Sequence, residues 1–202
     1  MASRAGDVVL ATRNPAKLTE LRRILAAYDI TLHGRAEFPE APDVAETGAT
    51  FAENALLKAR AVAAATGMVA VADDSGLTVE ALGGMPGVLS ARWSGRHGDD
   101  AANLQLVLDQ LVDVPDERRG AAFVCAAAAV APDGAELVVV ERVDGVVIRD
   151  PRGSNGFGYD PIFRPLGEQR TTAEMSAAEK DAISHRGKAF RALAPRLAEL
   201  LR

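Results

Sequence analysis

Residues 68–76 read Met-Val-Ala-Val-Ala-Asp-Asp-Ser-Gly, and this stretch decides the fold class. The first five side chains are apolar, which is typical of a central strand that is buried on both faces of a sheet. The sequence therefore predicts a strand over residues 68–72 that delivers a polar loop, Asp73 to Gly76, at its C-terminal end. Ligands of α/β proteins bind at such ends. Because alternate side chains of a strand point in opposite directions, at most one of Asp73 and Asp74 is expected to face a site.

The segments before this strand alternate between strand and helix patterns. Residues 8–11 form a short apolar run, and apolar side chains at helical spacing then predict a helix from Pro15 to about residue 27. A second strand is expected over residues 30–33. After a loop, Thr50 and Glu53 have the spacing of a capping box, which predicts the start of an alanine-rich helix that ends near Thr66.

The segments after it predict a hairpin, two loops and further helices. A loop is expected at residues 83–87, followed by a helix that is capped by Asp99 and Asp100 and ends near Leu111. Strands are expected over 123–130 and 137–143, joined by a turn at 132–134, with a strand extension at 146–148. A glycine-rich loop over 153–161, a capping box at Ser176 and Glu179, and a final helix from about Gly187 complete the chain. Together with the first half, this order predicts a single mixed α/β domain over residues 1–202.

The bulk composition excludes several classes of protein. The net charge of -5 provides no basic surface for nucleic acid, so no nucleic-acid partner is expected. No segment approaches the roughly 18 to 20 consecutive apolar residues of a membrane span, and the N-terminus lacks the apolar core of a signal peptide. A single cysteine, Cys125, can form no intramolecular disulfide. These features predict a cytoplasmic protein without membrane contact.

Thr12, Asn14 and Lys17 stand where a predicted strand turns into a helix. The free amides and the positive dipole end of a helix N-terminus attract anions, so a hydroxyl, an amide and a lysine at this place suit a triphosphate. The alternative is that Asn14 only caps the helix and that Lys17 is a solvated surface residue. The segment is not a Walker loop, because the required glycines and the Gly-Lys-Ser/Thr motif are absent.

Glu46, Asp73 and Asp74 are candidate ligands for Mg²⁺, which binds one or two carboxylates and completes its coordination with water and substrate phosphate. A carboxylate beside such a metal can also accept a proton from an attacking water. Alternatively, the two adjacent aspartates only form a turn.

Two further segments carry residues that suit a nucleoside. Phe157, Tyr159 and Asp160 can offer an aromatic face and a carboxylate to a base or sugar, although such a loop is often only packed. His185 and Arg186 place two donors side by side, one helical turn after Lys180. The alternative for this pair is a solvated helix end.

The combined motifs resemble the inosine triphosphate pyrophosphatase family, and within it the bacterial dITP/XTP pyrophosphatases. The match covers about residues 8 to 190. Six elements in this order carry it: Thr12-x-Asn14-x-x-Lys17-x-x-Glu20, Glu46-Thr47-Gly48 with Phe51-x-x-Asn54-Ala55-x-x-Lys58, Ala72-Asp73-Asp74-Ser75-Gly76, Gly83-Gly84-x-Pro86-Gly87 with Ser90-Ala91-Arg92, Gly156-Phe157-Gly158-Tyr159-Asp160-Pro161, and Ser184-His185-Arg186.

This resemblance implies an elongated α/β fold with a long twisted mixed sheet, two lobes around a central cleft, and a homodimer. It implies hydrolysis of noncanonical purine nucleoside triphosphates (ITP, dITP, XTP) to the monophosphate and pyrophosphate, with Mg²⁺ as cofactor. By matching positions, the metal ligands are Glu46 and Asp74, and Asp74 also activates the water. The triphosphate is held by Thr12, Arg13, Asn14, Pro15, Ala16, Lys17, Lys58 and Ser75, and the base and sugar pocket is lined by Phe157, Gly158, Tyr159, Asp160, Lys180, His185 and Arg186.

Two other functions compete with this hypothesis. One is a pyrophosphatase of the septum-inhibition type that prefers modified pyrimidine nucleotides, against which the Ser184-His185-Arg186 ending argues. The other is a nucleotide-binding sensor without turnover. The presence of both Glu46 and Asp74 argues against a sensor, because a sensor needs no carboxylate that activates water.

Overall fold

The computed structural model describes residues 6–12, 15–28 and 30–201. Within these residues, one sheet has six strands in the order β2-β1-β3-β4-β5-β6. Strand β1 pairs in parallel with both β2 and β3, whereas β5 and β6 are antiparallel, so the sheet is mixed. The predicted mixed α/β class is confirmed.

The elements of the described residues have the following bounds. The strands are β1 Asp7–Leu10, β2 Thr31–Gly34, β3 Ala70–Val79, β4 Gly120–Val130, β5 Glu136–Val147 and β6 Phe163–Pro165. The α-helices are α1 Pro15–Leu25, α2 Phe51–Thr66, α3 Asp100–Gln110, α4 Ala177–Ile183 and α5 His185–Leu200. Short 3₁₀ helices are η1 Ala26–Tyr28, η2 Arg35–Glu37, η3 Glu80–Leu82, η4 Gly87–Arg92, η5 Asp116–Arg118, η6 Asp160–Ile162 and η7 Thr172–Glu174. No helix of these residues is both long enough and apolar enough to cross a membrane.

The chain divides into two compact units. Unit 1 contains Met1–Asp74, Cys125–Glu141 and Arg186–Arg202, and unit 2 contains Ser75–Val124 and Arg142–His185. The boundaries between them fall inside β3, β4, β5 and α5. The central cleft implied by the resemblance stays a prediction.

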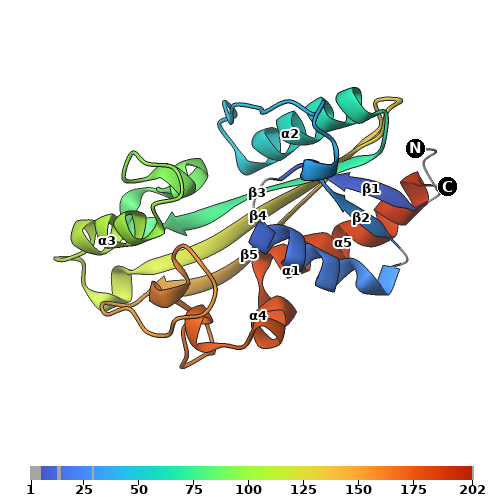
Figure 1. The fold of residues 1–202 in the computed structure, drawn as a ribbon. Coiled ribbons are helices and arrows are strands. Elements are labelled where there is room, and N and C mark those ends of the chain that lie inside the picture. The colour runs from blue at the N-terminus through green and yellow to red at the C-terminus, as the bar shows by residue number, and fades with distance from the viewer. Residues whose placement is uncertain (1–5, 13–14, 29, 202) are drawn as a thin grey trace. The chain divides into compact units, whose positions relative to one another are not determined.

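In unit 1, helices cover both faces of the sheet (Figure 1). On one face, Val8 and Leu10 of β1 pack in a buried cluster with residues of α1 and α5, such as Phe190. On the other face, Val9 packs in a second cluster with residues of α2, such as Val62. This division follows from the alternation of side chains along a strand.

The core of unit 2 forms where the second half of β3 meets α3. Leu77 and Val79 of β3 are fully buried with Val107 and Leu111, which lie in or directly after α3. Phe123 of β4 completes this cluster on the sheet. The spacing of four residues between Val107 and Leu111 places both on the helix face that packs against the sheet.

Local signals in the sequence begin the helices as predicted. Thr50 and Glu53 form the expected capping box of α2, and Ser176 and Glu179 form that of α4. The Asp99 side chain caps α3 by accepting a hydrogen bond from a backbone amide of its first turn. These caps satisfy amides that have no partner within the helix.

The polar loop expected at Asp73 to Gly76 is wrong, because these residues lie inside β3, which continues to Val79. The strand accommodates two buried carboxylates since both have cationic or amide partners, as described below. A Cβ on Gly76 would lie 2.2 Å from Ser90 Oγ, so glycine allows the chain segments to approach closely at this point.

Other element boundaries differ less from the prediction. The expected hairpin strands are longer, because β4 begins at Gly120 and β5 runs to Val147, which includes most of the expected extension over 146–148. The final helix begins at His185 rather than near Gly187. Terminal turns carry weak sequence signals, so such shifts are usual.

Candidate active site

Asp73 is the centre of a buried ion network in unit 1. Its Oδ2 accepts hydrogen bonds from Lys17 Nζ of α1 at 2.8 Å and from Arg186 Nε of α5 at 3.1 Å. A second guanidinium nitrogen of Arg186 donates to Glu20 Oε2 at 2.7 Å. The network thus balances two carboxylates with two cations, which is the condition for burying charges in a protein.

The charges of this network shift the pKa values of its members. Burial raises the pKa of Asp73, but the opposing effects of Lys17 and Arg186 are together stronger, so the pKa lies well below its ordinary value. Burial lowers the pKa of Arg186, whereas Asp73 and Glu20 raise it, and the net shift is upward. Both groups are therefore fully charged at neutral pH.

Asp74 belongs to a second group of contacts, which involves the loop before α2 and the helix itself. Its Oδ1 accepts a hydrogen bond from Lys58 Nζ at 3.1 Å, and its Oδ2 accepts one from Asn54 Nδ2 at 3.1 Å. Lys58 Nζ also donates to Glu46 Oε1 at 2.8 Å. Asn54 and Lys58 are four residues apart on α2 and so share one face. The side chains of Asp73 and Asp74 have different partners, as the alternation of a strand predicts.

Asp74 is a more basic carboxylate than an exposed aspartate. Burial raises its pKa, the Lys58 charge lowers it, the nearby Glu46 carboxylate raises it, and the net shift is upward. Burial also lowers the pKa of Lys58, but the surrounding carboxylates raise it by more. A carboxylate with a raised pKa accepts a proton more readily.

Glu46 and Asp74 fit the ligand requirements of Mg²⁺. Their carboxylates contact the same atom, Lys58 Nζ, so they converge on one point. Among the described residues, no group of three or more His, Cys, Asp or Glu side chains could hold a metal ion. A pair of carboxylates suits Mg²⁺ that takes its remaining ligands from water and phosphate, whereas a closed protein site needs more ligands.

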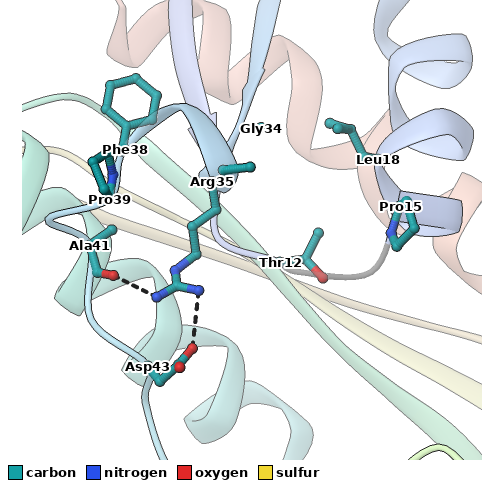
Figure 2. Close-up of a pocket in the computed structure, with 10 residues that line it drawn as sticks. Thr12, Pro15, Leu18, Gly34, Arg35, Phe38, Pro39, Ala41 and Asp43 are labelled. Atoms are coloured by element: carbon teal, nitrogen blue, oxygen red, sulfur yellow. Dashed lines mark hydrogen bonds and ion pairs between the residues drawn. The ribbon is translucent and has the colours of Figure 1, made fainter.

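Thr12 and Pro15 line a pocket of about 630 Å³ beyond the C-terminal ends of β1 and β2 (Figure 2). On the opposite side of this pocket lie Phe38 and Arg35, whose guanidinium binds Asp43 at 3.0 Å. The predicted phosphate segment therefore borders an open space. Lys17 follows in the first turn of α1. Arg13 and Asn14 lie outside the described residues, as does the side chain of Ala16.

Asp160 organises the predicted nucleoside loop in unit 2. Its Oδ2 accepts a hydrogen bond from the backbone amide of Phe157 at 2.9 Å and is paired with Lys180 Nζ. Its Oδ1 accepts a hydrogen bond from Thr172 Oγ1 at 2.7 Å. Lys180 Nζ also lies 5.1 Å from the centroid of the Phe157 ring, within the range of a cation–π contact. The structure thus brings Phe157, Asp160 and Lys180 together, and their role at a nucleoside stays a prediction.

Tyr159 does not offer an open aromatic face, which corrects one expectation for this loop. Its side chain is buried in the core of unit 2, and its hydroxyl donates to the backbone oxygen of Ser90 at 2.8 Å. Phe157, by contrast, is among the exposed large hydrophobic residues. An aromatic contact to a base from this loop would therefore come from Phe157.

His185 and Arg186 are adjacent in sequence, but they contact different groups. The His185 ring stacks on Phe123 with a centroid distance of 4.9 Å. Arg186 directs two nitrogens to Asp73 and Glu20, so its described contacts balance charge in unit 1. These contacts do not test whether the two side chains also face a base, so that role stays a prediction.

A family model, the Ham1 family, matches residues 8–196 of the chain. The chain belongs to the Ham1 family. This membership confirms the family that the six motifs indicated.

The chain is similar to proteins named dITP/XTP pyrophosphatase. The dITP/XTP pyrophosphatase of Streptomyces avermitilis is 62% identical over 196 residues, which cover 96% of this chain and 98% of the relative. The dITP/XTP pyrophosphatase of Mycobacterium tuberculosis is 57% identical over 196 residues, with 96% of each chain covered. The alignments thus span nearly the whole of each protein.

Solved structures of similar proteins share the fold. A HAM1 protein from Coxiella burnetii has a TM-score of 0.87 at 45% identity, with 96% of this chain and 98% of the other covered. A nucleoside-triphosphatase / dITP/XTP pyrophosphatase from Mycobacterium abscessus has a TM-score of 0.78 at 59% identity, with 94% and 99% covered. The mixed α/β architecture is therefore that of the Ham1 family.

One predicted residue of the candidate site, Ser75, lies beside Asp74, whereas the sequence did not predict the contacts of Asn54 and Glu20. Ser75, expected to bind phosphate, lies in β3 directly after Asp74. Asn54 received no role, although its spacing of four residues from Lys58 could have indicated that both side chains face one group. Glu20 belongs to the first motif, but its ion pair could not be predicted, because its partner Arg186 lies 166 residues away in sequence.

Proposed function

We propose that this Ham1 protein hydrolyses the noncanonical purine nucleoside triphosphates ITP, dITP and XTP to the monophosphate and pyrophosphate. The names of the relatives support dITP and XTP as substrates. Their alignment over nearly the whole chain confirms the predicted enzyme class of nucleoside triphosphate pyrophosphatase. The bases of these nucleotides carry a 6-oxo group. Hydrolysis to the monophosphate would remove such nucleotides from the triphosphate pool.

The position of Asp74 is the observation that carries the mechanism. Asp74 is held by Asn54 and Lys58, and its pKa is raised chiefly by burial. We assign it the role of the base that takes a proton from the water attacking the α-phosphate. A carboxylate in this role typically contributes a factor of about 10² to 10⁴ to the rate.

Lys17 and Lys58 supply the positive charge that a triphosphate needs. Each ammonium contacts a carboxylate of β3, so the bound phosphates would share these cations with Asp73 and Asp74. Glu46 and Asp74 offer the oxygen ligands for Mg²⁺, which when bound neutralises further charge on the leaving pyrophosphate. This assignment explains why lysines surround the two buried carboxylates in the middle of β3.

The residues around Asp160 in unit 2 can bind the nucleoside part of the substrate. Phe157 offers an exposed ring to the base, Asp160 a carboxylate to the base or sugar, and Lys180 and His185 nitrogen donors. Such donors favour the 6-oxo acceptor of hypoxanthine or xanthine, whereas adenine would place its amino group against another donor. The homodimer implied by the resemblance and the cytoplasmic location predicted from the composition remain parts of this proposal.

A substrate panel tests this function. We expect kcat/KM for ITP, dITP and XTP to exceed that for ATP by at least about 10²-fold, because a site built for an acceptor penalises a donor. ITP should yield IMP and pyrophosphate in equal amounts, and EDTA should stop the reaction until Mg²⁺ is restored. Products are separated by ion-exchange chromatography. IDP and orthophosphate as products would overturn the reaction class.

A further inference from the structure

The nucleoside loop of unit 2 is held by a second carboxylate that comes from a distant element. The backbone amide of Gly158 donates to Asp100 Oδ2 at 2.8 Å, although the two residues are 58 positions apart. The preceding amide, that of Phe157, donates to Asp160 instead. Two consecutive amides of the loop thus end on two carboxylates, and hydrogen bonds to charged acceptors are stronger than neutral ones.

Asp100 is available for this contact because its neighbour caps the helix. The Asp99 side chain accepts the hydrogen bond from Ala102 N at 3.2 Å and so satisfies the start of α3. Asp100 is the next residue, the first of α3, and its carboxylate extends to the loop. The two adjacent aspartates therefore have separate tasks, one within the helix and one between the helix and the loop.

The next loop residue is fixed as well. Tyr159 is buried and donates to the backbone oxygen of Ser90 in η4. With Gly158 attached to Asp100 and Tyr159 attached to η4, the backbone on one side of Phe157 has two anchors. Asp160 provides a further anchor through the amide of Phe157. The exposed Phe157 ring is consequently presented by a constrained backbone.

We infer that Asp100 is a positioning residue for base recognition: by accepting the Gly158 amide, it holds the Phe157 ring and the Asp160 carboxylate where a purine base binds. This inference rests on the proposed function, since it assigns the base to this loop. Constrained loops bind with a smaller loss of conformational freedom, so the fixed backbone favours affinity and selectivity. The contact of Asp100 is with the loop backbone, so Asp100 acts on the base through the loop.

The test compares Asp100→Ala with Asp100→Asn and with the control Asp99→Ala, which alters the same helix start without touching the loop. For Asp100→Ala we expect KM for ITP to rise about tenfold while kcat stays within about threefold of wild type. The ITP-to-ATP preference in kcat/KM should fall about tenfold. Changes of this size correspond to the loss of one charge-assisted hydrogen bond. Asp100→Asn retains an acceptor oxygen and should stay within about threefold of wild type. Asp99→Ala should preserve the preference.

A ligand without a base separates positioning from general damage. The Kd of inorganic tripolyphosphate, measured by calorimetry, should be unchanged in Asp100→Ala. Equal weakening of tripolyphosphate and ITP, or an unchanged ITP-to-ATP preference, would overturn the inference. If wild type fails to hydrolyse ITP, the proposed function is wrong. Hydrogen exchange at the Gly158 amide then still decides whether Asp100 fixes the loop. Faster exchange in Asp100→Ala than in Asp99→Ala would support a fixed loop, and equal exchange in the two variants would reject it.

Discussion

Asp74→Asn should remove nearly all turnover of ITP, by about 10³-fold or more, while the nucleotide still binds. Asparagine keeps the shape of the side chain but cannot accept the proton of the attacking water, and it is a poorer ligand for Mg²⁺. Lys17 and Lys58 remain to hold phosphate, so the Kd for ITP should change little. Single-turnover kinetics measures the chemical step, and calorimetry measures binding.

Asp144→Asn is the control for this variant, because Asp144 is an exposed carboxylate on β5. Its kinetics should match those of wild type. A rate for Asp74→Asn within about tenfold of wild type, a loss of only about 1.4 kcal/mol in transition-state stabilisation, would exclude Asp74 as the main base.

Arg186→Met should lower the free energy of unfolding by about 3 to 5 kcal/mol, because it leaves the buried carboxylates of Asp73 and Glu20 with one cation fewer. The loss should also depend on pH. The pKa of Asp73 is lowered in the folded protein, so its stabilising contribution is present above the ordinary value of 3.8 and is lost as the pH falls further. Without Arg186 that pKa is lowered less, and stability should decline less steeply in acid.

Arg60→Ala is the matched control, because Arg60 pairs with Glu136 at the protein surface. An exposed pair of this kind contributes at most about 1 kcal/mol. Urea unfolding of both variants and of wild type measures the difference. If Arg186→Met lost no more stability than Arg60→Ala, Arg186 would not stabilise the fold by compensating the buried charges of Asp73 and Glu20.

Local patterns were sufficient to predict most of the fold. The capping boxes at Thr50 and Ser176 mark the starts of α2 and α4 because cap and helix are only a few residues apart in sequence. The apolar runs of β1 and β4 likewise indicate strands without knowledge of their neighbours. Such signals act within one turn or one strand, so they can be found in the sequence alone.

The course of β3 could not be predicted in the same way. Two consecutive aspartates usually end a buried strand, because a buried carboxylate is costly without a partner. Here the partners of Asp73 are Lys17, 56 residues earlier, and Arg186, 113 residues later. Asp100 and Gly158, which also contact each other, are 58 residues apart in sequence. The motifs indicated the residues of the candidate site, but their pairing depends on tertiary contacts.

Hydrolysis of ITP in H₂¹⁸O tests the central claim most directly, because the position of the label shows which phosphorus the water attacks. If the water is activated by Asp74 at the α-phosphate, mass spectrometry should find one ¹⁸O atom in the phosphate of IMP and none in pyrophosphate. Label in pyrophosphate with unlabelled IMP would contradict the account, since water would then attack the β-phosphate. Label in orthophosphate would indicate removal of the γ-phosphate instead.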